Sequence, residues 1–160
     1  AAIDELTREH DVVVGLISEV RAASAAPDVP RMAQLARRIA AVLGPHTQVE
    51  ENGLFPAMEA DFPEHMAALR TEHRHVEAVL AEASTGTPAD PGWPARLTGV
   101  LGMLRQHILK EQDGVFPAAL AGLSTSDWEA VENVRVQAGS WMPAPRGGGN
   151  SAGSHQVGAS

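Results

Sequence analysis

The stretch HTQVEENGLFPA at residues 46–57 returns as HILKEQDGVFPA at residues 107–118. Each copy places a histidine four residues before a glutamate, as His46 and Glu50 in the first copy and His107 and Glu111 in the second. On a helix this spacing turns both side chains to one face, one turn apart. An imidazole nitrogen and a carboxylate oxygen can then reach the same metal ion, so the two copies indicate two ions.

A shorter repeat precedes each of these copies. Residues 6–10 read LTREH and residues 69–73 read LRTEH, so His10 and His73 also occupy matching positions. The chain is therefore an internal duplication. His10 and His73 are 63 positions apart, a period that is too long for stacked solenoid repeats and suits a pair of helical hairpins.

Apolar side chains recur at alternating three- and four-residue spacing, which is typical of helices packed in a bundle. This seam contains Ile3, Leu6, His10, Val13, Ile17 and Val20 in the first half, and Met66, Leu69, His73, Val76, Leu80 and Ala83 in the second. Residues 31 to about 60 and about 94–120 show the same periodicity. We therefore predict an all-α, up-down-up-down four-helix bundle, because the short turns expected at residues 27–30, 61–63 and 85–92 make neighbouring helices antiparallel.

Proline and serine residues predict details of this bundle. Pro45, Pro56 and Pro117 lie in or beside the two repeated metal-ligand segments, where the second and fourth helices should kink or loosen. A short fifth helix is expected to begin at Ser124 or Ser126, since either side chain can cap a helix. We expect this helix to pack across one end of the bundle.

The length of 160 residues fits one domain with a core of its own. We assign this domain to residues 1–142, with duplicated halves at about residues 3–60 and 64–122. Residues 143–160 are rich in Gly, Ser, Pro and Ala and carry almost no large apolar side chains. Such a segment cannot bury enough surface to offset its ordering entropy, so a disordered C-terminal tail is expected.

The composition excludes several classes of site. The chain has no cysteine, which excludes iron–sulfur clusters, thiolate zinc sites, disulfides and thiol catalysis. Any metal must then bind nitrogen and oxygen ligands, which suit iron, manganese or zinc. The net charge of −8, with Lys110 as the one lysine, argues against nucleic acid or an anionic membrane as partner. No apolar run approaches the ~20 residues that span a bilayer, and no export signal is visible, so a cytoplasmic location is expected.

Six side chains at duplicated seam positions form the candidate metal site: His10, His46, Glu50, His73, His107 and Glu111. Buried carboxylates are found paired or bound to metal, because an unpaired one is costly, and cationic side chains are scarce here. Glu77 lies one turn after His73 and is a candidate seventh ligand, with an exposed acid as the equal alternative. Glu51 and Asp113 are expected either to bind metal or to accept a hydrogen bond from a ligand.

The remaining histidines are interpreted as solvated surface residues. His65 borders a helix start, His75 points away from His73, and His155 lies in the predicted tail. Phe55 and Phe116 follow the two metal-ligand segments, and we expect them to form a dry wall around the site.

Together, these residues resemble the hemerythrin-like, or HHE cation-binding, domain family. The resemblance covers about Ile3 to Leu123 and rests on the ordered pattern His10, His46-x3-Glu50, His73, His107-x3-Glu111, with Phe-Pro after each acid. It implies a four-helix bundle with a non-haem di-iron centre, in which two Fe ions carry an oxo or hydroxo bridge. The resemblance also implies ligand roles: Glu50 and Glu111 bridge the ions, His10 and His46 bind one of them, and His73 and His107 bind the other.

The chain departs from the oxygen-carrying members of that family on two helices. Their third helix carries His-x3-His where this chain has His73-x3-Glu77, and their fourth carries His-x4-Asp where this chain has His107-x3-Glu111. One imidazole is therefore missing, which favours redox chemistry, sensing or iron handling over reversible oxygen carriage. The absence of tyrosine excludes a phenolate-ligated variant of the site.

We therefore predict a di-iron protein that reacts with O2 or a related small oxidant, for redox sensing or iron handling. The alternative is a di-iron enzyme of oxidative or nitrosative defence that acts on peroxide or nitric oxide, so enzymatic activity stays open. Iron storage and a purely structural metal are further alternatives, and zinc also suits the ligands. The expected partner is a small molecule, namely O2, peroxide or NO, and the sequence identifies no protein partner.

Overall fold

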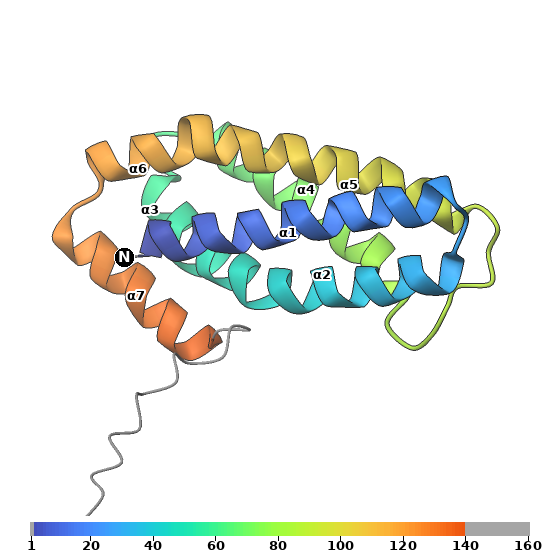
Figure 1. Ribbon diagram of the computed structural model, residues 1–160. Coiled ribbons are helices and arrows are strands. Elements are labelled where there is room, and N and C mark those ends of the chain that lie inside the picture. The colour runs from blue at the N-terminus through green and yellow to red at the C-terminus, as the bar shows by residue number, and fades with distance from the viewer. Residues whose placement is uncertain (1, 140–160) are drawn as a thin grey trace, which may run out of the picture.

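The computed structural model, which describes residues 2–139, contains four long helical segments, and consecutive segments run antiparallel (Figure 1). The first and third segments are α1 (Ala2–Ala25) and α4 (Pro63–Ala81). The second comprises α2 (Val29–Val49), η1 (Glu50–Leu54) and α3 (Phe55–Met58), and the fourth comprises α5 (Trp93–Lys110), η2 (Glu111–Val115) and α6 (Phe116–Gly122). A further helix, α7 (Thr125–Ala138), follows them. The predicted all-α, up-down-up-down four-helix bundle is thereby confirmed for the described residues.

The helix starts follow from local sequence chemistry. The Asp28 side chain accepts a hydrogen bond from the Arg31 backbone N–H at 3.1 Å and so caps α2. Pro30, Pro63 and Pro94 stand in the first two positions of α2, α4 and α5, where a missing N–H costs nothing. Ser124 caps α7 in a reciprocal capping box, so the first of the two predicted caps is the one used.

The loosening expected near Pro56 and Pro117 occurs within both repeated segments, whereas the loosening expected at Pro45 does not occur. The α-helix α2 continues through Pro45 to Val49, and the helix widens to a π-helix only from Glu50. There the Phe55 N–H bonds the Glu50 carbonyl, and the same five-residue bond recurs in η2. The wider turn precedes Pro56, whose ring would clash with a carbonyl of a regular α-turn. Both π-helices begin at a candidate metal ligand.

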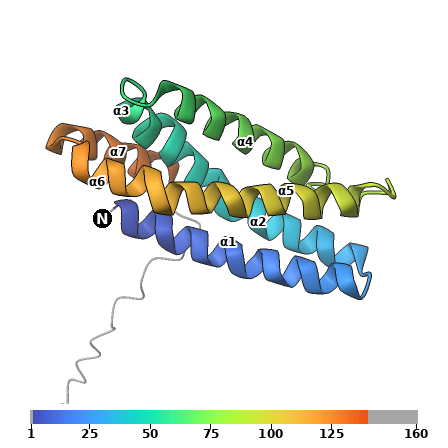
Figure 2. The same ribbon diagram turned by 90° about the horizontal axis from the view of Figure 1, so that it is seen from above.

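The core consists of two apolar clusters with the candidate metal residues between them. One cluster joins the inner faces of α1, α2, α4 and α5 from Val13 to Ile108, on the side of the α1–α2 turn. The other contains Leu6, Phe55 and Phe116 and extends to Val131 of α7. Seen from above, α7 lies at the end of the bundle opposite the α1–α2 turn and the α4–α5 connection (Figure 2). The fifth helix therefore packs across one end, as predicted.

A glycine allows α7 to approach η1 closely. A Cβ at Gly53 would lie 3.2 Å from the Val131 backbone and 3.5 Å from the Val134 Cβ. The duplicated position, Gly114 in η2, would have no heavy atom within 4 Å of such a Cβ. The helix α7 thus covers one half of the duplication, and none of the described residues lies as close to the equivalent position of the other half.

The described surface agrees with the remaining expectations. His65 and His75 are exposed, as predicted. No helix in the described range is both long and apolar enough to cross a membrane. The predicted tail, including His155, lies outside the described residues.

Candidate metal centre

Six buried side chains from the four helical segments meet at the middle of the bundle. Each segment contributes a histidine, and the two π-helices contribute a glutamate each at their first residue. Their exposed fractions lie between 0 % for the glutamates and 5 % for His73. The residues are His10 of α1, His46 of α2, Glu50 of η1, His73 of α4, His107 of α5 and Glu111 of η2. All six were predicted as a group from the duplicated spacing.

The six residues form two overlapping groups of potential ligands. One contains His10, His46, Glu50 and Glu111, and the other contains Glu50, His73, His107 and Glu111. Within each group one ligand atom per residue lies within 4.8 Å of all the others. Both glutamates belong to both groups, so the geometry offers two adjacent candidate positions for a cation, with two shared carboxylates.

The distances place a carboxylate between the histidines of the two halves. Glu50 Oε1 lies 2.9 Å from His46 Nε2, and Glu50 Oε2 lies 3.1 Å from His73 Nε2. Glu111 Oε1 lies 2.9 Å from His107 Nε2 and 3.3 Å from His10 Nε2. Glu50 Oε1 also lies 3.8 Å from His10 Nε2. Each glutamate thus faces histidines from both halves of the duplication, as a bridging ligand requires.

Despite these short distances, several of the buried atoms have no partner in hydrogen-bond geometry within the described part of the chain. They are both carboxylate oxygens of Glu50 and of Glu111, both ring nitrogens of His10, and His107 Nε2. A buried polar atom without a partner is costly, and carboxylates in particular are found paired or bound to metal. The Nε2 atoms of His10 and His107 face the unsatisfied oxygen Oε1 of Glu111, and these residues belong to the two groups of potential ligands. The residues therefore fit a pair of metal ions with nitrogen and oxygen ligands.

In the metal-free fold, burial and neighbouring charges shift the pKa values of the two glutamates in opposite directions. Burial and the nearby Glu50 carboxylate raise the pKa of Glu111 well above its usual value. Burial would raise the pKa of Glu50 too, but the neighbouring His46 lowers it well below that range. Burial and the adjacent His46 lower the pKa of His10 to about 3. Two cations would replace this arrangement, because metal ligands are deprotonated histidines and carboxylates.

Three further carboxylates hold the outer nitrogens of three of the histidines. Glu9 Oε1 lies 3.1 Å from His46 Nδ1, and Glu72 Oε2 lies 2.9 Å from His107 Nδ1. Glu51 Oε1 lies 3.2 Å from His73 Nδ1. Such contacts fix the imidazole with its hydrogen on Nδ1, which leaves Nε2 free to bind metal.

Two of these carboxylates were missed in the sequence. Glu9 and Glu72 belong to the repeated segments LTREH and LRTEH, and this repeat was the available signal. Each glutamate precedes one metal-site histidine and contacts another on the next helix, which spacing along a single helix does not reveal. Glu51 was predicted either to bind metal or to accept a hydrogen bond, and its position corresponds to the second role.

A cationic side chain contacts each of the two repeated carboxylates, Glu9 and Glu72. Arg135 of α7 donates two hydrogen bonds to Glu9, at 3.1 and 2.8 Å, and Lys110 of α5 donates one to Glu72. Burial alone would raise the pKa of Glu9, but the hydrogen bonds of His46 and Arg135 lower it below its usual value. Arg135 is buried, whereas Lys110 is exposed. Each half thus contains a chain of contacts from a histidine through a carboxylate to a cation, which we call the outer relay. It consists of His46, Glu9 and Arg135 in the first half and of His107, Glu72 and Lys110 in the second.

The two phenylalanines of the repeated segments lie against the site. The Phe116 ring stacks on His10 with centroids 5.4 Å apart, and the Phe55 ring stacks on His73 with centroids 5.7 Å apart. Both phenylalanines are buried. They form the dry wall expected from the sequence, each against a histidine of the opposite half.

Two candidate residues lie apart from the cluster. Glu77 is exposed, and neither group of potential ligands contains it. The inner face of α4 continues from His73 through Val76 and Leu80, and this rotation turns Glu77 outward. Asp113 is also exposed and lines a surface pocket instead.

The fold and the site define a class of protein: a four-helix bundle that binds metal cations between its helices through histidine and glutamate. A family model for the hemerythrin HHE cation-binding domain matches residues 1–119. The chain belongs to this family, as the sequence indicated. Searches of curated proteins and of solved structures found no match.

Proposed function

We propose that the chain holds a dinuclear non-haem iron centre that reacts with O2 or a related small oxidant. The proposal is carried by one observation: two groups of four buried ligands share both of their glutamates. In this assignment Glu50 and Glu111 bridge the ions, His10 and His46 complete one position, and His73 and His107 complete the other. Bound iron would supply one-electron redox chemistry and coordination of the oxidant.

The ligand chemistry favours this choice of metal. Two shared carboxylates hold a pair of ions close together, the usual arrangement of two-metal sites. Two histidines and two shared carboxylates leave room at each ion for a further small ligand. Zinc suits the same donors but has no redox chemistry. The absence of cysteine leaves no thiolate for a softer metal.

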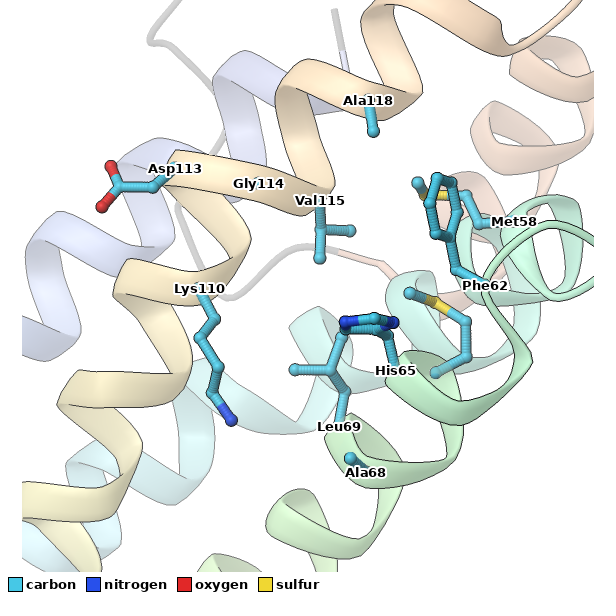
Figure 3. A pocket seen from close by; sticks show the side chains of 11 residues that line it. Met58, Phe62, His65, Ala68, Leu69, Lys110, Asp113, Gly114, Val115 and Ala118 are labelled. Atoms are coloured by element: carbon cyan, nitrogen blue, oxygen red, sulfur yellow. The ribbon is translucent and has the colours of Figure 1, made fainter.

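A largely apolar pocket, whose lining residues are shown in Figure 3, supports a small-molecule reactant. The pocket has a volume of about 470 Å³ and lies between α4 and the segment from Lys110 to Ala118. Its lining includes Leu69, one turn before His73, and Val115, one turn after Glu111. We infer that this pocket admits O2, peroxide or NO toward the His73–His107 half. Phe55 and Phe116 then keep bulk water from the ligands.

The test is anaerobic loading with ferrous iron followed by exposure to air, peroxide and NO in turn. We expect two irons per chain and an absorption spectrum of a bridged diferric centre after oxidation. Repeated consumption of peroxide or NO would select the enzyme of oxidative or nitrosative defence, whereas a single oxidation with O2 would select the sensing or iron-handling role. Bound iron that reacts with none of the three would contradict the proposal.

A pocket variant tests the route of entry. Ala118→Phe places a ring in the pocket, while Ala121→Phe adds the same ring on an exposed position of α6 that does not line it. We expect slower oxidation by O2 in Ala118→Phe with unchanged iron content, and an unchanged rate in Ala121→Phe. Equal rates in both variants would exclude the pocket as the entry route.

A further inference from the structure

The duplicated outer relays differ in where their cation comes from. In the second half, Lys110 bonds Glu72 from the same helix as His107, and Lys110 is exposed. In the first half, the cation is Arg135, which comes from α7 and lies 126 positions from Glu9 in the chain. The carboxylate that contacts His46 therefore depends on the docking of a separate helix, α7, for its cation.

The Arg135 contact is buried and bidentate. Its Nη1 donates to Glu9 Oε2 at 3.1 Å and its Nη2 donates to Glu9 Oε1 at 2.8 Å. Glu9 Oε1 is the same atom that faces His46 Nδ1. A planar guanidinium that holds both oxygens fixes the orientation of a carboxylate, which a single ammonium cannot do. Arg135 Nε also lies 3.0 Å from Glu5 Oε2, so α1 is bound at two points.

The helix α7 packs mainly against the first half of the bundle. It packs against η1, α2 and α1 and lies beyond the residues that the family model matches. At the equivalent place of the second half, Gly114 lines the pocket, and within residues 2–139 no neighbouring atom would lie within 4 Å of a Cβ there. A change at α7 can therefore reach the His10–His46 position directly, while the His73–His107 position has a relay of its own.

We propose that Arg135 is a positioning residue that couples the docking of α7 to the metal position formed by His10 and His46. By fixing Glu9, Arg135 holds the His46 ring with Nε2 directed at Glu50 and at the ion. Coupling of this kind is reciprocal, so metal at this position also holds α7 in place. The inference rests on the proposed dinuclear centre. It makes metal binding at the His10–His46 position dependent on α7, and metal binding at the His73–His107 position independent of α7.

The test compares Arg135→Met with Lys110→Met, which removes the equivalent cation of the other half. Anaerobic titration with ferrous iron measures the affinity of each ion, and hydrogen exchange measures the protection of α7 with and without metal. In the unchanged chain we expect metal to slow exchange in α7. In Arg135→Met we expect one of two ions to bind about tenfold more weakly or worse, and metal to lose its effect on α7. Lys110→Met should keep that effect, because its relay does not include α7.

Two further variants separate positioning from general stability. Arg135→Lys keeps a buried cation and should restore part of the lost affinity. The double variant Glu9→Gln/Arg135→Met removes both charges, so it folds without a buried unpaired carboxylate. Because its relay is also broken, metal should not protect α7 in this variant, and protection equal to that of the unchanged chain would overturn the inference.

The outcomes also distinguish this inference from the function on which it rests. Two ions bound with unchanged affinities in Arg135→Met, with metal still protecting α7, would overturn the role of Arg135 and leave the dinuclear centre intact. Fewer than two ions in the unchanged chain would overturn the centre itself, and the inference with it.

Discussion

His46 touches both Glu50 and Glu9, at 2.9 and 3.1 Å, so it joins the inner cluster to its outer support. Removing its ring takes a ligand from one group and leaves the second group of four complete. We therefore expect His46→Ala to bind one ion per chain instead of two, as measured by metal analysis after loading and desalting. His75→Ala and Glu77→Gln alter exposed residues of α4 and should keep both ions. Two ions in His46→Ala would contradict the ligand assignment.

The pH dependence of metal binding follows from His46 as well. Burial opposes its protonation, but Glu50 and Glu9 raise its pKa from 6.5 to about 9 in the metal-free fold. This bound proton stabilises the metal-free fold fully below about pH 6.5, and the stabilisation is lost as pH rises through about 9.

Metal must displace that proton at neutral pH. The apparent affinity should therefore rise with pH up to about 9, by about tenfold per unit for each proton displaced. Glu111, whose pKa is raised by burial and by Glu50, contributes in the same direction. Competition titrations at several pH values, with proton release followed by an indicator in weak buffer, measure this effect. An affinity that is independent of pH between 6.5 and 9 would exclude a protonated His46.

At the level of elements, the duplication provides a matched pair of glycines in the two π-helices. A Cβ at Gly53 would press on the Val131 backbone of α7 at 3.2 Å, whereas a Cβ at Gly114 would meet no neighbour within 4 Å in the described part of the chain. Alanine in a helix is better than glycine by up to about 1 kcal/mol, and overpacking costs about 1–3 kcal/mol. We expect Gly53→Ala to be less stable than Gly114→Ala by ~1 kcal/mol or more.

Urea denaturation of the two metal-free variants beside the unchanged chain measures this difference. Gly114→Ala should unfold at the same or a higher midpoint than the unchanged chain, and Gly53→Ala at a lower one. Equal midpoints for the two variants would show that α7 does not depend on its close approach to η1.

The helical segments and the six inner residues could be predicted because both depend on short spacings. Apolar side chains at three- and four-residue intervals define the helix faces, and the His-x3-Glu repeat puts two ligands on one of them. The π-helices at Glu50 and Glu111 were anticipated only as loosening near Pro56 and Pro117. Such a turn depends on how carbonyls are paired locally, which the apolar period does not reveal.

Contacts between distant segments could not be predicted in this way. Glu9 and Arg135 lie 126 positions apart, and their meeting depends on how α7 folds back onto η1 and α1. The rotation of α4 about its axis determines that Glu77 is exposed, since Val76 and not Glu77 continues the inner face after His73. Spacing alone left that choice open, because a residue four positions from a ligand can lie on either side of the buried face.

For the whole molecule, the centre is also part of the core. The layer of histidines and glutamates separates two apolar clusters, and its unsatisfied atoms are costly without metal. A ligand that binds the folded state stabilises it by mass action. We therefore expect a chelator to lower the melting temperature and to increase hydrogen exchange around η1 and η2, as measured by calorimetry and exchange of the same sample before and after chelation. Equal melting temperatures would mean that metal is not bound at this layer.

The central claim is that two metal ions share Glu50 and Glu111, and metal content per folded chain tests it most directly. Native mass spectrometry of protein loaded anaerobically with ferrous iron counts the ions on each chain. We predict two ions in the unchanged chain, and fewer in both Glu50→Ala and Glu111→Ala because each removes a ligand from both positions. A single ion in the unchanged chain, or two ions in either glutamate variant, would contradict the shared dinuclear centre.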